Sequence, residues 1–108
     1  MADLSQQKCV PCEGGVLPLK KKEYQTYLKI VGNWTVVEGK KIQKQFIFKN
    51  FIKAIAFINK IAAIAEAEGH HPDIRLFSWN KVEITLYTHA INGLHVNDFI
   101  LAAKINKL

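Results

Sequence analysis

Apolar residues recur with helical spacing in three parts of the chain, and each part predicts a helix. The first pattern follows Pro18 and ends before a glycine that suits a helix terminus. The second runs from Phe51 to about Glu68 with Asn50 as its N-cap, and the third runs from about Val96 to the last residue. Because apolar residues surround most of the second helix, we expect it to be largely buried, against a sheet or against a second subunit.

Residues with strand propensity predict two β-hairpins between these helices. The first hairpin covers residues 34–48. The second joins residues 74–79 to residues 82–88 through the two-residue connection Asn80-Lys81. This connection would pair the residues on either side of it and create one apolar core face from Phe77, Trp79, Val82, Ile84 and Leu86. His89 would then lie at a strand end and point away from the core.

The predicted order of elements is helix, two strands, helix, two strands, helix. Paired hairpins separated by helices indicate an α+β fold, in which helices pack on one face of a four-stranded antiparallel sheet. A chain of 108 residues has room for one domain. We divide it into an N-terminal arm, residues 1–18, which is polar and rich in glycine and proline, and a single folded domain, residues 19–108.

The composition is that of an ordinary globular domain, with 49% hydrophobic and 22% charged residues. No apolar run approaches the roughly 20 residues needed to cross a bilayer. The N-terminal residues also lack the blocks of a secretory signal, so we expect a cytoplasmic protein without membrane contacts. The net charge is +6, but Arg75 is the only arginine. Because proteins that read nucleic acids depend on arginine, nucleic-acid binding is not expected.

The chain has two cysteines, Cys9 and Cys12, separated by two residues. This spacing suits a redox pair or half of a zinc site. A redox pair is normally found where a strand leads into a helix, because the helix N-terminus lowers the pKa of a thiol. Here the pair lies in a polar segment that continues with Glu13-Gly14-Gly15. We therefore interpret the segment as an arm with two exposed thiols.

Three histidines are candidates for chemistry. His70 and His71 follow the second predicted helix, and His89 follows the second hairpin. Because an antiparallel hairpin brings its two ends together, we expect the three imidazoles to surround one patch. They could be surface or capping residues, metal ligands with Glu66 or Asp73, or a metal-free acid–base site. Adjacent residues in an extended segment point to opposite sides, which disfavours the metal site.

The spacing of these residues resembles the pattern of the pterin-4a-carbinolamine dehydratase family. That pattern contains an acidic residue, His-His-Pro, an aromatic residue, a histidine and an aspartate, and the matching positions here are Glu66, His70, His71, Pro72, Trp79, His89 and Asp98. The cysteine-containing segment also resembles the arm of some bacterial members. His95 departs from the family, because a serine or threonine often caps the last helix there, so the capping box is expected to be weaker.

The resemblance implies that 4a-hydroxytetrahydropterin is dehydrated to quinonoid dihydropterin and water, without a metal or a bound cofactor. We expect His70 and His89 to act as acid and base, and His71 to position the pterin. Pro72, Glu66 and Asp98 would support this site, although first-turn charge at a helix N-terminus is the simpler interpretation of Asp98. Trp79 is expected to pack in the core.

The resemblance also implies partners. Dehydration would recycle the pterin cofactor of aromatic amino acid hydroxylases such as phenylalanine hydroxylase. The apolar helix 51–68 suggests a homo-dimer or homo-tetramer. The alternative function is a non-catalytic binding module, because the family in animals includes a dimerisation cofactor, or transcriptional coactivator, for a homeodomain protein.

Overall fold

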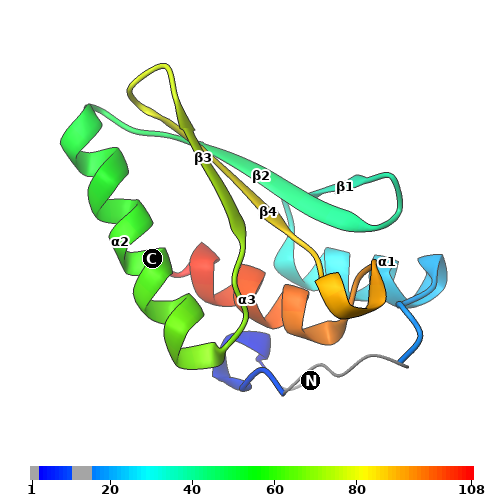
Figure 1. The fold of residues 1–108 in the computed structure, drawn as a ribbon. Coiled ribbons are helices and arrows are strands. Elements are labelled where there is room, and N and C mark those ends of the chain that lie inside the picture. Colours follow the sequence, from blue (N-terminus) through cyan, green and yellow to red (C-terminus); the bar gives the residue numbers. More distant parts are fainter. Residues whose placement is uncertain (1–2, 11–15) are drawn as a thin grey trace.

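A computed structural model describes residues 3–10 and 16–108 of the chain (Figure 1). In this part of the chain, the helices lie on one face of a four-stranded antiparallel sheet, which confirms the predicted α+β fold. The elements in order are the 3-10 helix η1 (Leu4–Gln6), α1 (Lys21–Val31), β1 (Thr35–Val37), β2 (Lys41–Ile47), α2 (Phe51–Glu68), β3 (Asp73–Phe77), β4 (Lys81–Leu86), the 3-10 helix η2 (His89–Ile91) and α3 (Val96–Asn106).

The two hairpins meet at the centre of the sheet. The strand order is β1-β2-β4-β3, so β2 of the first hairpin pairs with β4 of the second. Ile42 pairs with Leu86 across this junction, and both side chains are fully buried. The core face of β4 carries Val82, Ile84 and Leu86, as predicted, and alternates with partly exposed residues. The buried face of the sheet therefore depends on both halves of the chain.

The predicted turn of the second hairpin is wrong. Val82 pairs with Leu76, so the loop consists of the three residues 78–80, and Trp79 does not pair with Val82. The loop is fixed by its neighbour β2, because Asn80 exchanges two hydrogen bonds with the backbone of Phe48, each 2.9 Å long. This contact between distant segments sets the register of the hairpin.

The observed pairing is shifted by three residues from the predicted one, because Val82 pairs with Leu76 in place of Trp79. A shift by an odd number of residues moves each side chain to the other face of a sheet. Phe77 accordingly leaves the core face, and its ring contacts Arg75, whose guanidinium carbon lies 4.1 Å from the ring centroid. Trp79 adopts a left-handed conformation in the loop and is 60% exposed. The expectation that Trp79 packs in the core is therefore wrong.

Burial of the helices also differs from expectation. In α2 a single stripe is buried, formed by Ala54, Phe57, Ile61 and Ala65, whereas Ile52 is 77% exposed. The expectation that α2 is largely buried is wrong for the single chain, and its burial against a second subunit stays a prediction. The most buried helix is α3, which packs against α1, α2 and η1. Among the described residues, no helix has both the length and the apolarity to cross a membrane.

The arm is anchored at its beginning by η1, which lies against α3. Leu4 is buried in the core, and Asp3 accepts hydrogen bonds from the Lys107 ammonium and from Ser5, at 2.9 and 2.8 Å. These contacts, with Lys107 the larger, lower the pKa of Asp3 to about 2. Because the depressed pKa favours the folded state above the ordinary value of 3.8, this contribution declines as the pH falls below 3.8 and is lost as it passes through about 2. The boundary between arm and domain at residue 18 stays a prediction.

Gly93 is buried where Pro18 leaves no room for a side chain. A Cβ atom at Gly93 would lie 2.6 Å from the Cβ of Pro18. We expect Gly93→Ala to lower the free energy of unfolding by about 1–3 kcal/mol, as measured by urea denaturation, because the chain must shift to avoid the clash. In Pro18→Gly, which removes the opposing atoms, the same substitution should have a smaller effect. An equal loss in both backgrounds would show that Pro18 is not the cause.

Candidate active site

The three candidate histidines line one pocket, which has a volume of about 320 Å³. It lies between the connection from α2 to β3, the connection from β4 to α3, and Val10 of the N-terminal arm. His70, His71, Pro72 and His89 are among its lining residues. The predicted gathering of the imidazoles around a common site is therefore confirmed, and the volume is in the range of small-molecule sites. We call this the histidine pocket.

The end of α2 directs the two adjacent histidines to different partners. Gly69 has φ 65° and ψ 27°, a left-handed conformation that ends the helix, and the N–H of His70 donates to the carbonyl of Ala65 over 3.2 Å. The chain then leaves in an extended conformation, where successive side chains point to opposite sides. His70 consequently turns towards α3, and His71 turns back towards α2.

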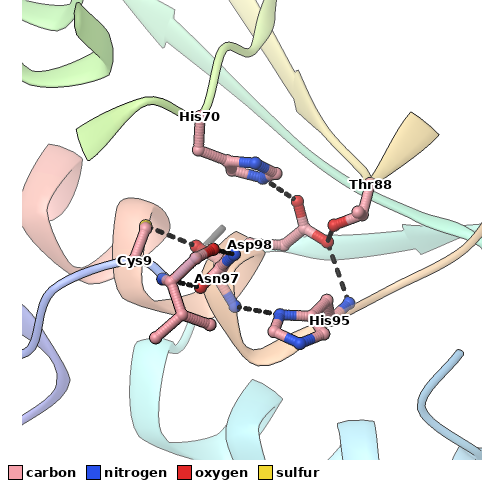
Figure 2. A network of polar contacts seen from close by, with 7 residues as sticks. Cys9, His70, Thr88, His95, Asn97 and Asp98 are labelled. Carbon is pink, nitrogen blue, oxygen red and sulfur yellow. Dashed lines mark hydrogen bonds and ion pairs between the residues drawn. The ribbon is translucent and has the colours of Figure 1, made fainter. Parts of the chain in front are cut away.

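His70 forms the best-held contact of the pocket. Its Nε2 lies 2.6 Å from Oδ1 of Asp98, a side chain that is fully buried at the start of α3. The other carboxylate oxygen accepts from the Thr88 hydroxyl and from the His95 N–H, both over 3.0 Å. Figure 2 shows these three donors around the carboxylate. Because a carboxylate only accepts, we assign the His70 proton to Nε2, which leaves Nδ1 free to act on a ligand.

Asp98 also belongs to the N-terminal cap of α3. It accepts from the His95 N–H, while Nδ1 of His95 accepts from the N–H of Asn97 over 3.1 Å. Both contacts of a capping box are present, with the imidazole as the acceptor in place of the usual hydroxyl, and its expected weakness stays a prediction. One carboxylate thus caps a helix and holds His70, so both interpretations of Asp98 apply.

His71 and Glu66 form a looser pair on the rim of the pocket. Nε2 of His71 lies 3.2 Å from Oε1 of Glu66, and both side chains are exposed. Exposed pairs of this kind contribute at most about 1 kcal/mol to stability. The pair therefore orients His71 without fixing it as firmly as Asp98 fixes His70.

His89 reaches the pocket from β4. It is exposed and begins η2, directly after Thr88, whose N–H donates to the carbonyl of Gly93 over 2.9 Å and closes the loop. Its ring packs on Tyr87, with the two centroids 4.0 Å apart, and the Lys41 ammonium lies 4.5 Å from the Tyr87 centroid. His89 is thus supported by aromatic packing, in contrast to the carboxylate contacts of His70 and His71.

Within residues 3–10 and 16–108, no group of three or more His, Cys, Asp and Glu side chains is arranged to hold a metal ion. The cysteine pair was a second candidate, and Cys12 lies outside the described residues. Cys9 is half-buried, with Sγ 3.6 Å from the carbonyl oxygen of Asn97. Burial, and then the charge of Glu68, raises the pKa of Cys9 to about 12. The interpretation as an exposed thiol is therefore wrong for Cys9.

We expect Cys9 to react slowly with iodoacetamide while the chain is folded. Only the thiolate is alkylated, and a pKa of about 12 leaves roughly a thousandth of the thiolate that a free cysteine has at pH 8. In a Cys12→Ser variant, mass spectrometry should detect labelling that accelerates about tenfold per pH unit. The control is the same variant in urea, where labelling should be fast. Equally fast labelling of the folded chain would contradict the burial of the thiol.

Comparison with known proteins decides the family. The family model described as Pterin 4 alpha carbinolamine dehydratase matches residues 17–108. The chain belongs to this family. The family predicted from the histidine pattern is therefore confirmed.

Relatives of the dehydratase family match over nearly the whole chain. A Rickettsia canadensis protein with the provisional name pterin-4-alpha-carbinolamine dehydratase is 54% identical over 106 residues, which are 97% of this chain and 96% of the relative. The Arabidopsis thaliana protein named pterin-4-alpha-carbinolamine dehydratase 2, mitochondrial, is 46% identical over 112 residues, covering 100% of this chain and 60% of the relative.

Two solved structures have a similar fold. A Brucella melitensis protein described as transcriptional coactivator/pterin dehydratase has a TM-score of 0.78 at 34% identity, covering 83% of this chain and 96% of the other. A pterin dehydratase-like protein described as a RuBisCO assembly factor in the alpha-carboxysome has a TM-score of 0.59 at 26% identity, covering 70% of this chain and 88% of the other. Similar folds in this family are thus described with different functions.

Most of the dehydratase motif of this chain comes together at the histidine pocket. Asp98 lies behind His70, Glu66 lies beside His71, and the remaining histidine and Pro72 line the wall. Trp79 does not join them, since it lies at the other end of the β3–β4 hairpin. Five residues that line the pocket were not predicted as site residues from the sequence: Val10, Gly69, Thr88, Ala90 and Asn97. For Thr88, the signal was its place directly before His89.

Proposed function

We propose that this chain dehydrates 4a-hydroxytetrahydropterin to quinonoid dihydropterin and water by acid–base catalysis. The proposal is supported by one observation above all, that three imidazoles from two separate connections line a single pocket. Histidine both donates and accepts protons near neutral pH, as this reaction requires. The membership of the chain in the carbinolamine dehydratase family gives the substrate class.

The reaction needs one proton delivered and one removed. An acid protonates the hydroxyl at C4a, the C4a–O bond breaks, and water leaves. A base takes the proton from N5, and the electron pair of that N–H bond forms the N5=C4a double bond. Two imidazoles that approach the pocket from different elements are suited to these two tasks.

We assign the base to His70 and the acid to His89. Nδ1 of His70 accepts the N5 proton, and the buried carboxylate of Asp98, 2.6 Å from Nε2, stabilises the resulting positive charge. His89 is exposed, so it exchanges protons with water between turnovers. His71, oriented by Glu66 on the rim, positions the pterin, and Pro72 restricts the backbone that follows.

The proposal is tested by the rate of dehydration of a 4a-carbinolamine generated in the assay by a pterin-dependent hydroxylase. The chain should accelerate the disappearance of the carbinolamine absorbance well beyond the spontaneous rate. Treatment of the chain with a metal chelator, which is removed before the assay so that the hydroxylase keeps its activity, should not reduce that rate. A rate equal to the spontaneous one would overturn the proposal, and a loss with chelator would overturn its acid–base form. We also propose that the product returns to an aromatic amino acid hydroxylase, such as phenylalanine hydroxylase, after reduction.

A second candidate function is protein binding, favoured by the exposed apolar face of α2. Phe51 and Ile52 are exposed on this helix, and large apolar side chains gathered on a surface mark interaction sites. The solved Brucella melitensis structure is described as a transcriptional coactivator as well as a dehydratase. The same face would serve a homo-dimer or homo-tetramer. Light scattering of the wild type and of Ile52→Lys distinguishes self-association from a face that is free for another partner.

A further inference from the structure

The N-terminal arm crosses from α3 to the end of α2 and reaches the histidine pocket. Near its beginning, the Lys104 ammonium donates to the carbonyl of Ser5 over 2.9 Å. Further along, the Cys9 N–H donates to the Glu68 carboxylate over 2.8 Å, and Glu68 is the last residue of α2. Contacts distributed along residues 3–10 therefore hold the arm against the body of the protein.

Val10 is held by both of its backbone polar groups. Its N–H donates to Oδ1 of Asn97 over 3.0 Å, and its carbonyl accepts from Nδ2 of Asn97 over 2.7 Å. Asn97 is 1% exposed, so its amide is almost completely removed from water and depends on these partners. Two hydrogen bonds from one planar amide fix the orientation of the Val10 backbone as well as its position.

This contact lies beside the residues assigned to chemistry. Val10 lines the same pocket as His70 and His89, and the residue is 55% exposed. Asn97 directly precedes Asp98, so the first turn of α3 holds the arm with one residue and His70 with the next (Figure 2). The arm and the base are thus positioned by the same rigid element.

We propose that the described part of the arm, residues 3–10, forms one wall of the binding site, with Val10 in contact with the bound substrate and Asn97 as the residue that positions Val10. The wall supplies apolar surface to a pocket that is otherwise lined mainly by histidine and other polar groups. A flat heteroaromatic ligand needs apolar protein surface against one face or one edge of its ring system. That the ligand is a pterin rests on the proposed function, whereas the wall itself is a property of the pocket.

The alternative is that the arm only adds stability. In that case Val10 and Asn97 would matter no more for ligand affinity than contacts of similar strength elsewhere. The chain offers matched controls for both residues. Val16 is 50% exposed and lies outside the pocket. Asn106, at the other end of α3, is exposed but also binds distant segments through its amide, accepting from Trp34 over 3.0 Å and donating to the Val31 carbonyl over 2.8 Å.

The experiment measures the dissociation constant of 7,8-dihydrobiopterin by quenching of tryptophan fluorescence in the full chain. Val10→Ala should raise it about threefold to tenfold, the effect of losing two methyl groups from a contact. Asn97→Ala should raise it at least as much, because the whole wall is then released. Val16→Ala and Asn106→Ala should stay within about twofold of the wild type. In turnover, KM should rise by the same factor while kcat stays within about twofold.

A measurement without pterin separates this inference from the proposed function. Diethylpyrocarbonate modifies exposed imidazoles, and peptide mass spectrometry follows each histidine. Asn97→Ala should speed modification of His70 about threefold or more, because an open arm exposes the pocket, and should leave the already exposed His71 unchanged.

The possible results lead to distinct conclusions. If the wild type binds pterin and Val10→Ala binds it equally well, the inference that Val10 contacts the ligand is overturned, while the proposed function stands. If the wild type binds no pterin, the proposed function fails, and unchanged modification of His70 would then overturn the wall as well. If Asn97→Ala does not fold, Val10→Ala, whose side chain is half exposed, decides the question by affinity and by modification of His70.

Discussion

His70→Ala and His89→Ala are each expected to slow dehydration by about 10²–10⁴-fold while the chain stays folded. Each variant removes one of the two proton-transfer groups proposed for the reaction, and neither side chain belongs to the buried core. The kcat of each variant, measured from pH 5 to 9, should lose one limb of its pH dependence. Because the two groups act on one transition state, the double variant should be little slower than the slower single one.

The fourth histidine provides the control for this experiment. His95 lies outside the pocket and its imidazole caps α3, a role that asparagine also fulfils well. His95→Asn should therefore keep the rate within about threefold of the wild type. His71→Ala should mainly raise KM, as expected for a residue that positions the substrate. Full activity in both His70→Ala and His89→Ala would overturn the assignment of acid and base.

Asp98→Asn is expected to lower activity strongly while it leaves stability nearly unchanged. The amide keeps an oxygen that can accept from Thr88 and from the His95 N–H, so the fold should be nearly as stable as the wild type. Its NH₂ group, however, faces Nε2 of His70 and forces the imidazole into the other tautomer, with the proton on Nδ1. The base is then blocked and its positive charge is no longer stabilised. We expect kcat to fall by about 10²–10⁴-fold.

Asp98→Ala should instead damage both properties. It leaves the Thr88 hydroxyl and the His95 N–H without an acceptor in a buried position, and His70 without its partner. The free energy of unfolding should fall by about 3–5 kcal/mol in urea denaturation. An Asp98→Asn variant with wild-type kcat would contradict the role of the carboxylate, and an Asp98→Ala variant with wild-type stability would contradict its role in the fold.

Local signals in the sequence were sufficient to predict the ends of α2 and the core face of β4. The ends of α2 follow from an asparagine cap and a terminal glycine, and both ends match the prediction. The core face of β4 follows from its alternation. The turn of the second hairpin could not be found in this way, because its register is set by hydrogen bonds between Asn80 and Phe48, the residue directly after β2. A prediction from residues that are neighbours in the sequence cannot include a contact between such distant positions.

The candidate active site, like the fold, could be predicted from the sequence only in part. Hairpin geometry was enough to bring His70 and His71 near His89. The contact of Asp98 with His70 depends on how α3 packs, and only the family resemblance placed Asp98 at the site. Val10 is separated from Asn97 by 87 positions, so no pattern along the chain connects them. Residues that complete the pocket from the arm therefore required the three-dimensional structure.

The pairing of β2 with β4 has a consequence for how the active chain is assembled. Every motif residue lies between positions 66 and 98, yet the central strand of that segment is paired with and packed beside β2, which precedes it. The segment alone lacks the partner that completes its core, so the motif residues acquire their arrangement only when both halves condense together. Such long-range pairing slows folding and makes it cooperative, so we expect the histidine pocket to form only in the fully folded chain.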